Sequence, residues 1–101
     1  MNTAQTILDQ IRAGRTSDNK SGTLAMMCWA ARNYKALKDA FAFRVSGYLF
    51  HGNVLVRLEP NDLYTVEFYN TRWKLKKSVK DVFCDQLTAT IDTEVEMKQS
   101  K

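Results

Sequence analysis

Apolar residues recur with two different spacings along this chain, and the spacing separates helical segments from strands. Near the N-terminus, Ile7, Leu8 and Ile11 lie at helical spacing. The sequence therefore predicts a short helix over residues 3–13, which Gly14 can end. Because a helix of this length is only marginally stable alone, we expect it to pack against the rest of the domain.

Strict alternation of apolar and polar residues predicts three strands in the middle of the chain. Every second residue is apolar in residues 41–46, 53–59 and 63–69, which places those side chains on one face of a strand. A hairpin joins the first two strands, and His51 is interpreted as a residue of its turn. Residues 59–62, with proline at the second position, predict a type I turn before the third strand.

The alternation changes phase at residues 70–71. Before this point the apolar face holds even-numbered residues, whereas Trp73 and Leu75 after it are odd-numbered. Since a shift of one residue inverts the two faces of a strand, we expect a turn or bulge here. A last short strand is predicted over residues 72–76, with Trp73 in the core.

An amphipathic helix that packs on the sheet is predicted over residues 78–92. Ser78 and Asp81 resemble a capping box that would begin this helix. The apolar residues that follow recur every four positions, at Val79, Phe83, Leu87 and Ile91. Asp81, Asp85 and Asp92 lie on this helix. Asp81 and Asp85 are four residues apart and share a face, which is interpreted as solvated rather than as a metal pair. Residues 93–101 are expected to form a loose C-terminal tail.

Two other segments complete the prediction. Residues 24–34 are either a buried strand or part of a helix, because periodicity does not distinguish the two in a short apolar run. The polar residues 15–22 are expected to form a mobile loop. The chain is thus predicted to be one α+β domain over residues 1–101, with a short N-terminal helix, a small antiparallel sheet of about four to five strands, and the amphipathic C-terminal helix packed on the sheet.

Composition limits the classes of function. The chain has 101 residues, 45% of them hydrophobic and 26% charged, and a net charge of +4. It has no apolar run long enough to span a membrane and no secretory leader, so no membrane association is expected. Two cysteines and one histidine are too few for a zinc site built from these residues. Gly-rich phosphate loops and nucleophile elbows are also missing from the sequence. We therefore expect no catalytic residues, no metal and no cofactor.

The cysteines are expected to be reduced and buried. Cys28 and Cys84 lie far apart in apolar surroundings, as buried thiols of cytosolic proteins often do. An alternative is a thiol nucleophile that uses His51 as its base, which would require one cysteine to meet His51 in space.

Basic residues concentrate near residues 72–80 without an intervening acid. They are Arg72, Lys74, Lys76, Lys77 and Lys80. On a strand over 72–76, Arg72, Lys74 and Lys76 would share one face. Arg44 and Arg57 on neighbouring strands would extend this basic surface, and Tyr48, Phe50 and Tyr69 are candidate aromatic contacts. The cluster suits the phosphates of nucleic acid or an acidic protein surface, but it also suits a solvated edge strand on which lysines discourage aggregation.

The turn between the last two alternating strands resembles a known signature. Leu58-x-Pro60-x-Asp62-Leu63-Tyr64-x-Val66-x-Phe68 is similar to a motif of small bacteriophage and prophage proteins of unassigned function. Residues 82–87 and 3–11 also resemble the closing helix and the start of those proteins. Residues 27–34 lack the group's glycine turn, and residues 93–95 lack its closing Thr-Gly-Leu. The resemblance implies a phage origin and a compact α+β fold, and it transfers no site residue.

These observations lead to one main functional expectation and an alternative. The first is a non-enzymatic phage accessory protein in the host cytoplasm, which binds a host protein or nucleoprotein complex stoichiometrically. Such a protein would inhibit a host defence or nucleic-acid-processing complex, as an anti-CRISPR-like blocker does. The alternative is a nucleic-acid-binding module that uses the basic segment 72–77. An uncovered sheet edge would also allow a homodimer.

Overall fold

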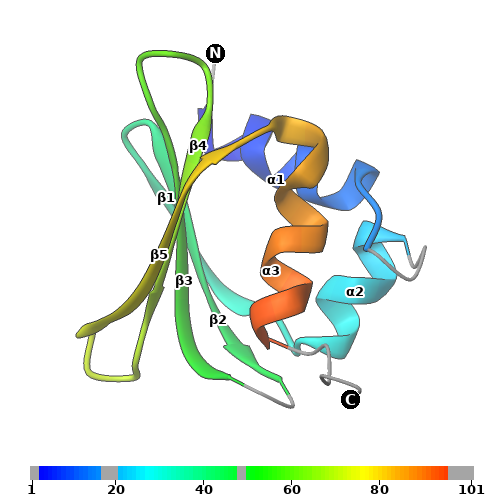
Figure 1. Ribbon diagram of the computed structural model, residues 1–101. Coiled ribbons are helices and arrows are strands. Elements are labelled where there is room, and N and C mark those ends of the chain that lie inside the picture. Colours follow the sequence, from blue (N-terminus) through cyan, green and yellow to red (C-terminus); the bar gives the residue numbers. More distant parts are fainter. Residues whose placement is uncertain (1–2, 17–20, 48–49, 96–101) are drawn as a thin grey trace.

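A five-stranded antiparallel sheet and three α-helices form two layers in this computed structural model, which describes residues 3–16, 21–47 and 50–95. All three helices cover the same face of the sheet, as Figure 1 shows. The strands lie in the order β1-β2-β3-β4-β5. The elements are α1 (Thr3–Ala13), α2 (Gly22–Cys28), β1 (Arg32–Leu37), β2 (Ala40–Ser46), β3 (His51–Leu58), β4 (Tyr64–Tyr69), β5 (Leu75–Val82), the 3-10 turn η1 (Cys84–Gln86) and α3 (Leu87–Val95).

The predicted fold class is confirmed. An N-terminal helix, an antiparallel sheet and a C-terminal helix packed on that sheet are all present. The first helix has the predicted bounds, and β2, β3 and β4 occupy the three segments with strict alternation. Most of the alternating apolar side chains belong to the buried core cluster: Phe41, Phe43, Val45, Val54, Val56, Val66 and Phe68. The predicted turn at residues 59–62 is also present, with the Asp62 N–H donating to the Glu59 carbonyl at 3.0 Å.

Residues 24–34 form part of a helix followed by the start of a strand. Helix α2 begins after Ser21, whose hydroxyl accepts a hydrogen bond from the Leu24 N–H at 3.2 Å. The helix stops at Trp29, and Ala30 has a φ of 54° that turns the chain into β1. Because β1 is an edge strand whose six residues are all exposed, its sequence carries no alternating apolar pattern. No alternation of apolar and polar residues therefore indicated this strand.

The C-terminal prediction was wrong in its boundaries. The last strand runs over Leu75–Val82 rather than 72–76, so the predicted helix over 78–92 does not begin at Ser78. The pairing of β5 with β4 is irregular at two places. One of them lies between Val79 and Val82, where Asp81 has a φ of 59°. A bulge there lets both Val79 and Val82 face the helices, although they are three residues apart. A spacing of three residues between apolar positions is typical of a helix, so this segment of the strand was predicted as helical.

The helical part begins only after Phe83. The Phe83 N–H donates to the Gln86 side chain at 3.4 Å, and the ring of Phe83 is exposed rather than buried. The helix then continues to Val95, which is fully buried, so residues 93–95 are not a loose tail. Residues 96–101 lie outside the described part of the chain.

The predicted loop over 15–22 is partly ordered by backbone contacts. Arg15 and Ser21 form an isolated antiparallel bridge, and the Gly22 N–H donates to the Gly14 carbonyl at 2.8 Å. A Cβ at position 22 would lie 1.8 Å from the Ile11 carbonyl oxygen, so only glycine allows α2 to approach α1 this closely. Residues 17–20 lie outside the described chain.

Trp29 joins the helices to the sheet. Its ring is 0% exposed and stacks on Phe43, with ring centroids 6.3 Å apart. Its Nε1 donates a hydrogen bond to the Asp92 carboxylate at 2.8 Å. Asp92 is buried on α3, and the hydrogen bond from Trp29 satisfies its carboxylate. Within the described chain, no helix is long and apolar enough to cross a membrane.

Candidate functional site

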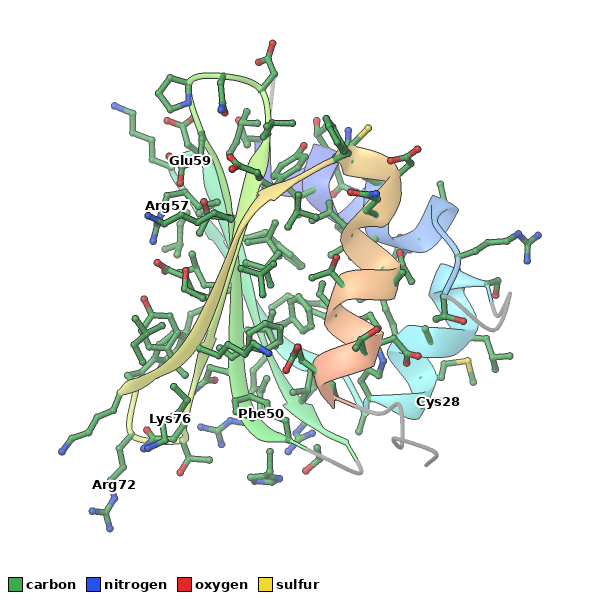
Figure 2. The ribbon with its side chains drawn as sticks, in the orientation of Figure 1. Cys28, Phe50, Arg57, Glu59, Arg72 and Lys76 are labelled. Carbon is green, nitrogen blue, oxygen red and sulfur yellow. The ribbon has the colours of Figure 1, made fainter. Side chains whose placement is uncertain are left out.

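The face of the sheet away from the helices is left open by the described chain. Figure 2 shows Arg57 and Glu59 on this open face, with Arg72 and Lys76 at the end of the sheet where β4 turns into β5. Strand pairing aligns Arg44, Asn53, Tyr69 and Leu75 in one row across the face. Arg44, Asn53 and Tyr69 lie beside core residues in the sequence, so the pleat points their side chains away from the core. Leu75 is on the same side because it is the cross-strand partner of Tyr69.

One half of the open face holds an ion-pair network. The Arg57 guanidinium bonds to the Glu67 carboxylate and lies 3.5 Å from that of Glu59. The Tyr69 hydroxyl donates to the same Glu67 carboxylate at 2.8 Å. Arg57, predicted to extend the basic surface, is thus compensated by two acids.

The network shifts the ionisation of its members. Burial favours the neutral acid of Glu67, but the hydrogen bonds from Arg57 and Tyr69 outweigh it, so the pKa of Glu67 lies below its ordinary value. The hydrogen bond to Glu67 raises the pKa of Arg57, although partial burial opposes this. The same carboxylate raises the pKa of Tyr69 by accepting its hydroxyl proton in a hydrogen bond.

Replacing Glu67 with glutamine should destabilise the fold mainly at neutral pH. A carboxyl whose pKa is depressed in the folded state stabilises the protein above its unfolded pKa of about 4.3, and that contribution disappears as pH falls through the folded value. We expect Glu67→Gln to lose about 1 kcal/mol at pH 7. Urea denaturation of both proteins at pH 7 and pH 3 would measure this, and a difference of the same size at both pH values would contradict it.

The other half of the open face carries an aromatic pair, the half-buried Tyr69 and the exposed Trp73. Trp73 is 42% exposed, and its ring lies 5.4 Å from that of Tyr69 between centroids. The Lys35 ammonium, from β1, lies 5.5 Å from the centre of the Trp73 ring. The prediction that Trp73 belongs to the core is therefore wrong.

The turn between β4 and β5 explains where Trp73 lies. Asn70 closes this turn: its carbonyl accepts from the Trp73 N–H at 2.9 Å, and its side-chain oxygen accepts from the N–H groups of Arg72 and Lys74. Trp73 itself has a φ of 63°. The change of phase at residues 70–71 was correctly taken for a turn, but Trp73 is part of that turn and precedes the strand.

The residues of the predicted basic segment lie in different parts of the structure. Arg72 is in the turn and Lys74 precedes β5, so Arg72, Lys74 and Lys76 do not share one face of a strand as predicted. Lys77 is opposite Phe68 on the helix side and pairs with Glu94 at 2.6 Å. Lys80 lies at the other end of β5, beside a hollow of about 390 Å³ that Glu59 and Asp81 also line.

We call the remaining group the aromatic–basic surface. It comprises Tyr69, Trp73 and Leu75 with the cations Lys35 and Arg44. Three exposed cations next to Trp73 and Leu75 in the sequence are counted with it: Arg72, Lys74 and Lys76. In the described chain none of these five cations forms an ion pair. The Nε of Arg44 is buried and has no hydrogen-bond partner there. Leu75, also expected to face the core, is 53% exposed. The surface thus combines uncompensated positive charge with exposed apolar area.

Phe50, one of the predicted aromatic contacts, does not join this surface. Phe50 packs against the core and meets Phe68 edge to face at 5.7 Å. Figure 2 accordingly shows Phe50 on the helix side of the sheet. Tyr48 lies outside the described residues. Sequence reasoning missed Lys35, because β1 was not predicted, and it missed Trp73 and Leu75, because their apolar character indicated the core.

The candidate thiol chemistry receives no support from the geometry. Cys28, at the end of α2, and Cys84, in η1, are exposed, so the expectation of buried thiols was wrong. His51 begins β3 instead of lying in a turn, and its Nδ1 lies 2.5 Å from the Ser46 hydroxyl. No group of three or more His, Cys, Asp or Glu side chains in the described chain could hold a metal ion.

Comparisons with known proteins add no relative to this description. The chain matches no protein-family model, no curated protein and no solved structure at a significant level.

Proposed function

We propose that this protein acts by binding rather than by catalysis, and that the aromatic–basic surface contacts single-stranded nucleic acid, either free or within a nucleoprotein complex. The observation that carries the proposal is the exposed Trp73 ring, supported by Tyr69 and approached by the Lys35 ammonium. An exposed aromatic ring is a platform on which a base can stack, and nearby cations attract the phosphates on either side of that base.

Charge strengthens this assignment over a simple solvated edge. The acids of the open face that form ion pairs, Glu59 and Glu67, are both engaged by Arg57. The cations around Trp73 therefore keep their full attraction for an anion. Lysines that only protect a sheet edge would not need an exposed tryptophan beside them, since exposed apolar area favours the aggregation that those lysines prevent.

The biological setting that we propose follows from the resemblance to small phage proteins. A small protein that acts by covering a surface must be present in stoichiometric amounts, as inhibitors of host complexes are. We therefore place the protein in the host cytoplasm, as a phage accessory protein that interferes with a nucleic-acid-processing or defence complex. This setting rests on a motif of structural residues and is independent of the surface chemistry.

A salt titration should reveal the proposed contact. We expect labelled single-stranded oligonucleotides to bind with measurable anisotropy at low salt. The logarithm of the affinity should fall linearly with the logarithm of the salt concentration, with a slope of about −0.7 for each phosphate contacted. Double-stranded DNA should bind more weakly, because its bases are not available for stacking on Trp73.

The matched control for this titration is a variant on the opposite face. Lys77→Glu reverses one charge on the helix side, whereas Lys76→Glu reverses the exposed charge next to Leu75. We expect only Lys76→Glu to weaken binding strongly and flatten the salt dependence. An equal loss of affinity in both variants would show that binding depends only on the net charge of the protein. If no oligonucleotide bound at low salt, nucleic acid would be rejected as the partner.

An acidic protein surface is the second candidate partner. The adjacent exposed side chains of Trp73 and Leu75, surrounded by cations, also resemble the apolar centre and polar rim of a protein interface. Saturable one-to-one binding to a purified acidic host protein, without affinity for free oligonucleotides, would favour this candidate.

A further inference from the structure

The edge of the sheet formed by β1 is a second surface, which meets the proposed nucleic-acid contact at Lys35. β1 is the outermost strand, and each of its six residues is exposed. An edge strand leaves half of its backbone N–H and C=O groups without a partner strand. An extended peptide can satisfy these groups by pairing as an additional strand.

Beside this edge lies a groove that an added strand could fill. The groove has a volume of about 270 Å³, and four of the six residues that line it are aliphatic or phenylalanine; its lining is Ala4, Gln5, Leu8, Tyr34, Ala36 and Phe41. A second hollow, of about 180 Å³, also includes Tyr34 and is lined by Met27 and Arg12 among others. Tyr34 faces the helix side, since its ring lies 5.6 Å from that of Phe41. Alternate side chains of a strand paired with β1 would point into these hollows.

Charge decides which kind of strand this edge can accept. Residues 32–38 contain Arg32, Lys35 and Lys38 and no acid. The opposite edge, β5, contains Lys76, Lys77 and Lys80 against the single acid Asp81. Pairing two copies through either edge, or β1 with β5, would place cations against cations, which is unfavourable. A homodimer through a sheet edge is therefore disfavoured, and an acidic strand is complementary.

We propose that the β1 edge binds an extended, acidic segment of a partner protein, in which apolar residues alternate with aspartate or glutamate. The backbone of the segment pairs with β1. Its apolar side chains enter the groove between α1 and β1, and its carboxylates meet Arg32 on the opposite side of the sheet. This inference does not depend on nucleic-acid binding at the aromatic–basic surface.

A designed peptide provides the probe. A fluorescein-labelled ten-residue peptide in which leucine or valine alternates with glutamate should bind the full chain, as measured by anisotropy. Three control peptides separate the contributions: one with lysine in place of glutamate, one with the same composition in scrambled order, and one with alternate backbone amides N-methylated. The N-methylated peptide keeps every side chain and loses hydrogen-bond donors, so only strand addition predicts that it binds weakly.

Two variants locate the contact. Ala36→Glu places a negative charge at the mouth of the groove, and Ser78→Glu makes the same change on the exposed β5 edge. We expect Ala36→Glu to weaken peptide binding at least about tenfold and Ser78→Glu to leave it unchanged. Amide exchange should slow in β1 when the peptide binds. Three results would overturn the proposal. The designed peptide could bind no better than the scrambled one, amide exchange could slow in β5 instead of β1, or the free chain could form dimers as its concentration rises.

Trp73→Ala distinguishes this proposal from the function proposed above. The variant removes the ring that should stack on a base, whereas the α1–β1 groove does not include position 73. Peptide binding by Trp73→Ala should therefore equal that of the natural sequence. A loss of peptide binding in this variant would show that the peptide uses the aromatic–basic surface, which would contradict the β1 assignment.

Discussion

Trp29→Ala should destabilise the fold by about 3–5 kcal/mol, the largest effect that we expect from a single substitution. The indole is 0% exposed, so its loss leaves a cavity between α2, α3 and the sheet. It also removes the donor to the Asp92 carboxylate, which is 1% exposed. For a chain of this length the midpoint of thermal unfolding should fall by about 12 °C or more. Circular dichroism during thermal and urea denaturation would measure both changes.

Two further variants separate the packing of Trp29 from its hydrogen bond. Trp29→Phe keeps an aromatic ring over Phe43 but leaves Asp92 without its donor, and we expect it to lose about 1–3 kcal/mol. Adding Asp92→Leu to this variant should restore part of the stability, because removing both partners leaves no buried group unsatisfied. A loss below about 1 kcal/mol in Trp29→Ala would contradict the position of this residue in the core.

Trp73→Ala should weaken single-stranded nucleic-acid binding about 5-fold to 150-fold while changing stability by less than about 1 kcal/mol. The loss corresponds to one base that stacks on the exposed ring. The stability should change little, because Trp73 is in a surface turn whose hydrogen bonds use backbone atoms and the side chain of Asn70. Anisotropy titrations and thermal denaturation of the same samples would measure the two quantities.

Phe83→Ala is the matched control for Trp73→Ala. Phe83 is another exposed aromatic residue, and it lies between β5 and η1, away from the turn that holds Trp73. Its removal should leave nucleic-acid binding unchanged. If Trp73→Ala also left the affinity unchanged, Trp73 would not be a stacking platform, and the proposed contact would be rejected.

The candidate site was only partly predictable from the sequence. Five basic residues in the segment 72–80 indicated an anionic partner, but pairing with Glu94 places Lys77 on the other face of the sheet. Arg57 was correctly placed on an outward face, although its charge is compensated by Glu67 and Glu59. Lys35 could not be found, because it reaches Trp73 from a strand that is distant in sequence. Each of these placements depends on contacts between segments that are distant in the sequence, and a local sequence pattern does not show such contacts.

The sequence by itself determined the α+β class, the first helix and the three central strands. These elements have one face against the core, so their apolar residues repeat with the period of the local structure, and that period can be seen without a partner. The tertiary structure alone decided the edge strands and the exposure of Trp73. β1 buries no residue, and the irregular pairing of β5 with β4 changes which of its residues face the helices. Where a strand takes its register from its neighbour, the chain's own periodicity no longer indicates which side chains reach the core.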